Sequence, residues 1–136
     1  MNAVGMTEEK MREEIISDLS LNMFVEAGAG AGKTTLIVSR IVNMLSADVE
    51  PGEIVVITFT NAAAEELRTR ITDKLSRAAK NNPDLKDKLH RLNEMNISTI
   101  HSFCNVLLHE QGLMTKLPID LEMLQDDEEK QEKKEL

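Results

Sequence analysis

The sequence predicts an α/β fold in which a partial parallel sheet lies between two layers of helices. Short apolar segments alternate with longer helical patterns along the 136 residues, in the order α-β-α-β-α-α-β-α. The segment at residues 53–59 contains a continuous apolar run at 54–57, as is typical of a strand covered on both faces of a parallel sheet. The length is sufficient for one domain with a real core, which eight methionines and only three aromatic residues help to fill.

The first half of the chain is expected to contain two helices and two strands. Residues 6–19 form the first predicted helix, because Thr7 is placed to cap its start and apolar residues recur at every fourth position. Pro51-Gly52 separates the later elements. These are a buried strand over residues 23–27, a helix over 33–45 and a second strand over 53–59.

The second half begins with a long amphipathic helix over residues 61–79, which Asn81-Asn82-Pro83 ends before a short helix begins. A third strand over 96–99 and a last helix over 101–111, ended by Gly112, follow. After Pro118 the sequence becomes charged and aperiodic. We therefore expect a domain over residues 1–118 and an acidic tail, or the start of a further subdomain, over 119–136.

Charge and cysteine content limit the classes of function. The net charge is −8, but the tail carries eight carboxylates and three lysines, which leaves only −3 for the other 118 residues. A local DNA-binding surface is therefore compatible with the body of the chain. The single Cys104 excludes an internal disulfide, no apolar run reaches the roughly 18 residues of a membrane span, and no signal peptide is evident. These features predict a cytoplasmic protein without membrane contact.

The segment VEAGAGAGKTT at residues 25–35 is typical of a phosphate-binding loop. Glycines let the backbone turn its N–H groups toward an anion, and the following helix adds its own N–H groups. Lys33 supplies a charge for the β and γ phosphates, and Thr34 a hydroxyl for Mg²⁺. A flexible Gly/Ala turn is the plain alternative, but a predicted strand before and a helix after favour the P-loop. The residues expected to bind nucleotide are Ala27, Gly28, Ala29, Gly30, Ala31, Gly32, Lys33, Thr34 and Thr35.

Two later stretches, ITFTNAAAEEL at residues 57–67 and ISTIHSFC at 97–104, place hydroxyls and an aromatic ring after a predicted strand. Such groups donate to phosphate oxygens or stack on bases. Read alone, Thr60 or Asn61 is more simply a helix cap and Phe59 a core residue. Cys104 is expected to be a core thiol, and no second ligand pair stands at zinc spacing.

Together and in this order, the three stretches resemble the first motifs of superfamily 1 DNA helicases of the UvrD/Rep class. The residues of these motifs are most similar to those of the RecB/AddA-like members, the ATP-dependent exonuclease V beta subunits. The family's loop commonly reads Ala-Gly-Ala-Gly-x-Gly-Lys-Thr, so Ala27 is ordinary there. The resemblance covers about residues 7 to 112 and implies a RecA-like P-loop NTPase fold, specifically the N-terminal part of motor domain 1A.

The resemblance also implies ligands and contact residues. ATP and Mg²⁺ would bind the loop, with Lys33 and Thr34 as its catalytic residues. Single-stranded DNA would contact Thr58, Phe59, Thr60, Asn61, Thr99, His101 and Phe103. In this sequence Ala62 replaces a lysine common in the second motif, and Arg12 stands where many members have an adenine-reading glutamine. For Arg40, a family role and a solvated helix position are equally good interpretations.

Hydrolysis requires further groups, and none follows Thr35. No apolar strand ends in Asp-Glu, so the acids that hold Mg²⁺ and orient water are missing, as is an arginine finger. We expect negligible turnover by this chain alone. A strand at residues 23–27 would also have an unpaired edge, which predicts a homodimer, a swapped oligomer or marginal stability. The family implies a helicase–nuclease partner subunit. The alternatives are a self-contained small P-loop kinase and a non-catalytic nucleotide-binding or oligomerising module.

Overall fold

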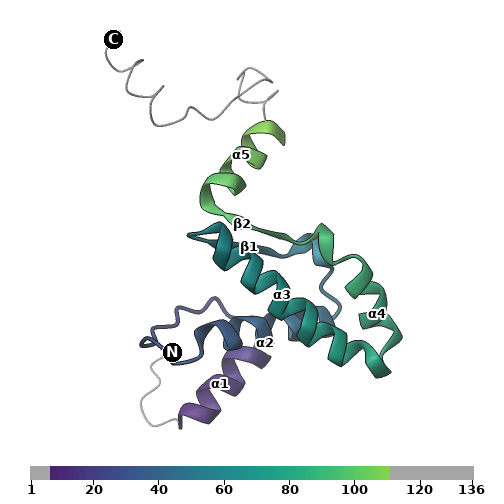
Figure 1. The fold of residues 1–136 in the computed structure, drawn as a ribbon. Coiled ribbons are helices and arrows are strands. Elements are labelled where there is room, and N and C mark those ends of the chain that lie inside the picture. Colours follow the sequence, from purple (N-terminus) through teal and green to yellow (C-terminus); the bar gives the residue numbers. More distant parts are fainter. Residues whose placement is uncertain (1–6, 111–136) are drawn as a thin grey trace. The chain divides into compact units, whose positions relative to one another are not determined.

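The computed structural model describes residues 7–110, and the chain divides into two compact units, residues 1–100 and 101–136. The predicted helix start at Met6, the stop at Gly112 and the acidic tail lie outside the described residues. In chain order the elements are α1 Glu8–Ser17, α2 Lys33–Ser46, the 3-10 helix η1 Pro51–Glu53, β1 Val55–Thr58, α3 Asn61–Ala78, η2 Ala79–Asn81, α4 Pro83–His90, η3 Leu92–Glu94, β2 Asn96–Thr99 and α5 Ile100–Glu110 (Figure 1).

The two strands form a parallel pair, as predicted. Val55 lies opposite Asn96 and Thr58 opposite Thr99, so both strands end at the same edge of the sheet. The connection between them runs through α3 and α4, and α3 packs against both strands (Figure 1). This parallel pair with its crossover helices confirms the mixed α/β class.

The core of the first unit lies between α2, α3 and one face of the sheet. Leu45, Ile71, Leu75 and Met95 are almost completely buried. The apolar face of α3 repeats every three to four residues, as an amphipathic helix requires, and its buried residues are Ala64, Leu67, Ile71 and Leu75. Burial of these side chains is the main stabilisation of the unit.

The predicted strand at residues 23–27 does not form. This segment is without regular structure, and the exposed fractions of Phe24 and Val25 are 93% and 39%. A strand requires a hydrogen-bonded neighbour, and the sheet of the described residues consists of β1 and β2 alone. The apolar composition was therefore insufficient to place this segment in the sheet.

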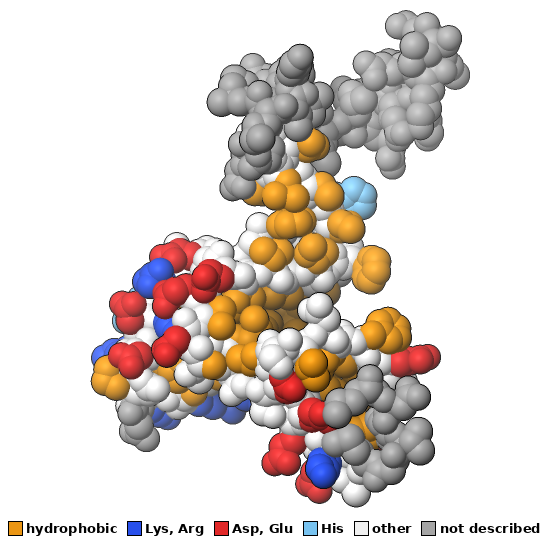
Figure 2. All heavy atoms as spheres, turned by 180° about the vertical axis from the view of Figure 1, so that it is seen from behind, with side chains coloured by type: hydrophobic (Ala, Val, Ile, Leu, Met, Phe, Trp, Pro, Cys, Tyr) orange, Lys and Arg blue, Asp and Glu red, His pale blue; other side chains and the backbone are white. Residues whose placement is uncertain are grey.

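The sheet is covered on one face only within the first unit. Val56 and Ile97 face the core, whereas Val55 and Ile57 point the other way and are each 47% exposed. Figure 2 shows the molecule from behind, where hydrophobic side chains reach the surface between groups of acidic ones. The expectation of a strand buried on both faces is therefore wrong for β1, because α3 packs on a single side.

No helix within residues 7–110 combines the length and the apolar character needed to cross a membrane.

Candidate functional site

The loop before α2 has the backbone shape of an anion cradle. Gly30 and Gly32 have φ angles of +77° and +78°, a conformation that a Cβ atom disfavours. A Cβ added at Gly28 or Gly30 would meet no atom within 4 Å, so the loop is open at these positions. The N–H of Ala31 donates to the carbonyl of Gly28 at 3.3 Å and closes the turn. The glycines predicted to shape the loop do so at positions 30 and 32.

Lys33 lies at the mouth of this loop. Its Nζ donates to the carbonyl oxygens of Ala27, at 2.6 Å, and Gly28, at 2.8 Å. Lys33 is also the first residue of α2, which carries no side-chain cap and no acidic residue in its first turn. The free N–H groups of that turn and the ammonium together make a positive site suited to phosphate.

The hydroxyls of Thr34 and Thr35 follow on the first turn of α2, where Thr34 is half-buried and Thr35 is exposed. A hydroxyl at this place is a suitable ligand for a phosphate-bound Mg²⁺. Within residues 7–110, no three His, Cys, Asp or Glu side chains gather to hold a metal ion by themselves.

Arg12 reaches from α1 to the loop. Its Nη2 donates to the carbonyl of Ala31 at 2.7 Å and to Oε1 of Glu8 at 2.9 Å. A Cβ added at Gly32 would lie 3.5 Å from the Arg12 guanidinium. The structure thus places Arg12, with Glu8 beside it, against the loop.

A cavity of about 950 Å³ lies beside the loop. Its walls are α1, with Met11 and Ile15, and the irregular residues 21–27, while Lys33 and Leu36 form the side nearest the loop. Ligand cavities in proteins are commonly of about 300–1,000 Å³ and mostly apolar with a few polar groups. Its size and its position next to Lys33 suit the base and sugar of a nucleotide whose phosphates occupy the loop.

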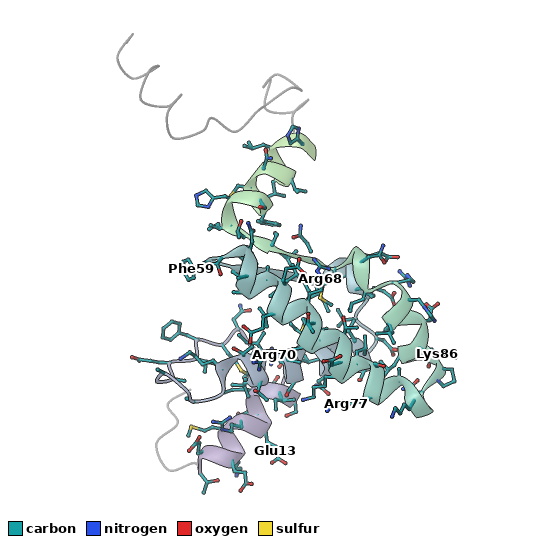
Figure 3. All side chains as sticks on the ribbon, in the orientation of Figure 1. Glu13, Phe59, Arg68, Arg70, Arg77 and Lys86 are labelled. Atoms are coloured by element: carbon teal, nitrogen blue, oxygen red, sulfur yellow. The ribbon has the colours of Figure 1, made fainter. Side chains whose placement is uncertain are left out.

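The second predicted site lies where β1 ends. Phe59 is 98% exposed and points away from the body of the unit (Figure 3). Its interpretation as a core residue is therefore wrong. Thr60 caps α3, accepting from the N–H of Ala63 at 3.2 Å, and Thr58 Oγ1 donates to the carbonyl of Thr60 at 3.0 Å. These bonds hold the turn that presents the ring and Asn61, the exposed first residue of α3.

The third predicted site begins at the neighbouring strand end. Thr99 is buried and lies opposite Thr58 in the sheet, so these two predicted residues come together. His101 and Phe103 belong to α5 in the second unit, where His101 is exposed and Phe103 half-buried. Cys104 is exposed, which corrects the expectation of a core thiol: the half-buried positions of α5 around it are 102, 103 and 105.

Arg40 has a role that the sequence did not reveal. Its Nη1 donates to the carbonyl oxygens of Ile15 and Asp18, the latter at 2.7 Å. Asn43, one turn further along α2, donates from Nδ2 to the carbonyl of Ile16 at 2.9 Å. Neither residue is a solvated surface group, because both bind the C-terminal end of α1. These contacts span 22 to 27 residues and leave no local signal in the sequence.

Asp18 ends α1 with a tight turn. Its Oδ1 accepts from the hydroxyl of Ser20 at 2.6 Å and from the Ser20 N–H at 2.9 Å. These hydrogen bonds, with a smaller contribution from the charge of Arg40, hold the pKa of Asp18 below its usual value. The carboxylate is thus charged at neutral pH and fixes the turn into residues 21–27.

Comparison with known proteins gives a consistent family. The model of the UvrD/REP helicase N-terminal domain matches residues 8–136. The chain is 42% identical over 110 residues to the A subunit of the ATP-dependent helicase/nuclease of Clostridioides difficile (strain 630), a match that covers 76% of the chain and 8% of that protein. The protein of the same name in Lactobacillus helveticus (strain DPC 4571) is 38% identical over 122 residues, or 87% of the chain and 10% of that protein. The chain thus spans a tenth or less of these relatives.

Proposed function

The chain belongs to the UvrD/REP helicase family, and from this premise we propose that it binds ATP and contacts single-stranded DNA as the N-terminal part of an ATP-dependent helicase or helicase–nuclease of DNA repair or recombination. The observation that carries the proposal is the loop at residues 27–35. Its left-handed glycines, the ammonium of Lys33 and the uncapped start of α2 together favour a polyphosphate. Family membership also disfavours the alternative of a self-contained kinase.

The residues of the loop divide the work of binding. Backbone N–H groups over 28–35 surround the phosphates, Lys33 turns from its two carbonyl partners toward the β and γ phosphates, and Thr34 gives its hydroxyl to Mg²⁺. Arg12 fixes the loop at Ala31 and stands beside the cavity that would receive the base. When bound, ATP·Mg²⁺ supplies the phosphoryl group whose hydrolysis drives the family's motors.

We propose single-stranded DNA as the second ligand. Phe59 offers a whole ring face to stack on a base, and stacking of this kind contributes about 1–3 kcal/mol per base. Thr58 and Thr99 lie side by side at the strand ends, with Thr60 and Asn61 next to them, so hydroxyl and amide donors for phosphate oxygens gather near the ring. His101 and Phe103 would add contacts from the start of α5.

Turnover is a separate matter from binding. Neither β1 nor β2, the strands within residues 7–110, ends in paired acids, and we propose that this chain binds ATP without appreciable hydrolysis. A RecA-like three-layer arrangement completes the proposal for the whole protein, together with a partner subunit, which the relatives' names suggest. Self-association of the isolated chain stays a prediction, which light scattering tests.

The test of nucleotide binding compares two lysines. We expect Lys33→Ala to weaken binding of a fluorescent ATP analogue at least tenfold, the scale set by the loss of a charge-assisted hydrogen bond. Lys86→Ala removes an exposed lysine from α4 and should leave the affinity unchanged. Equal affinities for the two variants would contradict the proposed site. Hydrolysis at a helicase-like rate, stimulated by single-stranded DNA and lost in Lys33→Ala, would contradict the proposed lack of turnover.

The test of DNA binding compares two exposed aromatic residues. Phe59→Ala should weaken binding of a labelled single-stranded oligonucleotide about fivefold or more, measured by fluorescence anisotropy. Phe24→Ala removes a ring of similar exposure from the irregular residues 21–27 and should have little effect. If both substitutions weaken binding equally, contact through the strand ends is wrong.

A further inference from the structure

Helix α1 forms a wall of the cavity and packs against α2 without contributing to the buried core. None of its residues is fully buried, and a helix of 10 residues is marginal by itself in water. It nevertheless presents Arg12 to the loop, and Met11 and Ile15 to the cavity. The position of this wall therefore depends on its polar contacts as well as on half-buried side chains.

Arg40 and Asn43 provide these contacts at the far end of α1. The last carbonyl groups of a helix have no partner within it, and here the carbonyls of Ile15, Ile16 and Asp18 accept hydrogen bonds from the two side chains of α2. The Arg40 guanidinium also places a positive charge at the negative end of the helix dipole. Arg12, in the middle of α1, donates to the carbonyl of Ala31. The helix is thus attached to the loop at its middle and to α2 at its C-terminal end.

We propose that Arg40 and Asn43 are positioning residues for the nucleoside end of the nucleotide. They set the place of α1, and through it the shape of the cavity and the approach of Arg12, without touching the phosphates. The inference rests on the proposed ATP site, and it assigns to α2 two functions. The first turn of α2 binds phosphate, while its second and third turns hold the wall that the base meets.

The experiment separates the two ends of the ligand in the full 136-residue chain. Inorganic tripolyphosphate needs only the loop, whereas ATP also needs the cavity. We expect Arg40→Met to weaken the binding of ATP roughly tenfold, as the loss of charge-assisted hydrogen bonds implies, and to leave the affinity for tripolyphosphate unchanged. Arg40→Lys keeps the charge and should recover part of the loss. Arg77→Met, which removes an exposed arginine of α3 (Figure 3), is the control and should match the unsubstituted chain.

Hydrogen exchange tests the attachment of α1 in the absence of any ligand, through the protection of its amides. Amides of residues 11–17 should exchange faster in Arg40→Met, while those of α3 keep their protection. If Arg40→Met does not fold, Asn43→Ala takes its place. It removes a single hydrogen bond and should give a smaller change in the same direction. An equal loss for ATP and tripolyphosphate, or unchanged exchange in α1, would overturn the inference alone. An unsubstituted chain that binds neither ligand would overturn the proposed function and this inference together.

Discussion

The first unit consists of two regions that are stabilised by different means. In the region from α2 to β2, fourteen apolar side chains are buried, and Leu45, Ile71 and Leu75 are almost fully enclosed. In the region of residues 7–32, which contains α1 and the loop, no residue is fully buried. Polar contacts from Arg12, Arg40 and Asn43 hold it instead. The comparison indicates that burial sets the scaffold, whereas hydrogen bonds set the site, which is therefore the part more easily displaced.

The largest expected effect comes from shortening a core side chain. Leu75 is 0% exposed, so Leu75→Ala leaves a cavity and should lower the free energy of unfolding by about 2–5 kcal/mol in urea denaturation. Phe24→Ala, in the region of the loop, should change it by less than about 0.5 kcal/mol, although more atoms are removed. Similar losses for the two variants would show that residues 21–27 pack more tightly than the comparison holds.

A smaller loss is expected from the buried lysine of the scaffold. Lys88 is 6% exposed, and its Nζ donates to the carbonyl of Leu45 at 2.9 Å, with Oε1 of Glu50 at 3.7 Å. Lys88→Met leaves that carbonyl without this donor and should cost about 1–3 kcal/mol of unfolding free energy. Lys86→Met, two residues earlier on the exposed face of α4, serves as the control and should be close to neutral. A neutral Lys88→Met would mean that hydrogen bonds matter only in the region of the loop.

The loop itself should respond to backbone conformation alone. Gly30→Ala places a Cβ at a φ of +77° and should cost about 1–2 kcal/mol, although the added methyl meets open space. Gly28→Ala meets the same open space without a positive φ, so it should be neutral or slightly stabilising. Hydrogen exchange of the amides of the loop and of α1 in the two variants measures the difference. Equal protection would indicate that the loop relaxes freely around position 30.

The smallest expected effect is a dependence on acid pH in both regions. Arg91 holds the pKa of Glu94 below its usual value through a 2.9 Å ion pair, and Ser20 does so for Asp18. The unfolded chain then binds more protons than the folded one, so stability falls as the pH drops below about 4 and through the lowered pKa values. Glu94→Gln should reduce this dependence in global unfolding, whereas Asp18→Asn should reduce it only in hydrogen exchange of α1. Global loss from Asp18→Asn would contradict the independence of the two regions.

Most of the scaffold was predictable from the sequence, because its signals are local. Signals within a few residues predict its helices. Examples are the apolar period of α3, the cap of that helix at Thr60 and the start of α4 at Pro83. The prediction of a strand at residues 23–27 was wrong because five mainly apolar residues form a strand only where a neighbouring strand can pair with them. The loop was predictable through its glycines and Lys33. The attachment of α1 by Arg40 was not, because any solvated arginine has the same appearance in a sequence.

The hydrogen bonds of Lys33 raise the interaction energy that an anion must supply in order to occupy the proposed phosphate site. Two of the three N–H donors of the ammonium are engaged with the carbonyls of Ala27 and Gly28. An arriving anion must compete with these oxygens for the ammonium group. The net binding energy is therefore only the difference between the hydrogen bonds that Lys33 makes to the anion and those that it loses to the two carbonyls. A singly charged ion such as chloride gains little from that exchange, while a polyphosphate gains at several oxygens at once. If the loop binds phosphate as proposed, these hydrogen bonds favour anions of high charge density.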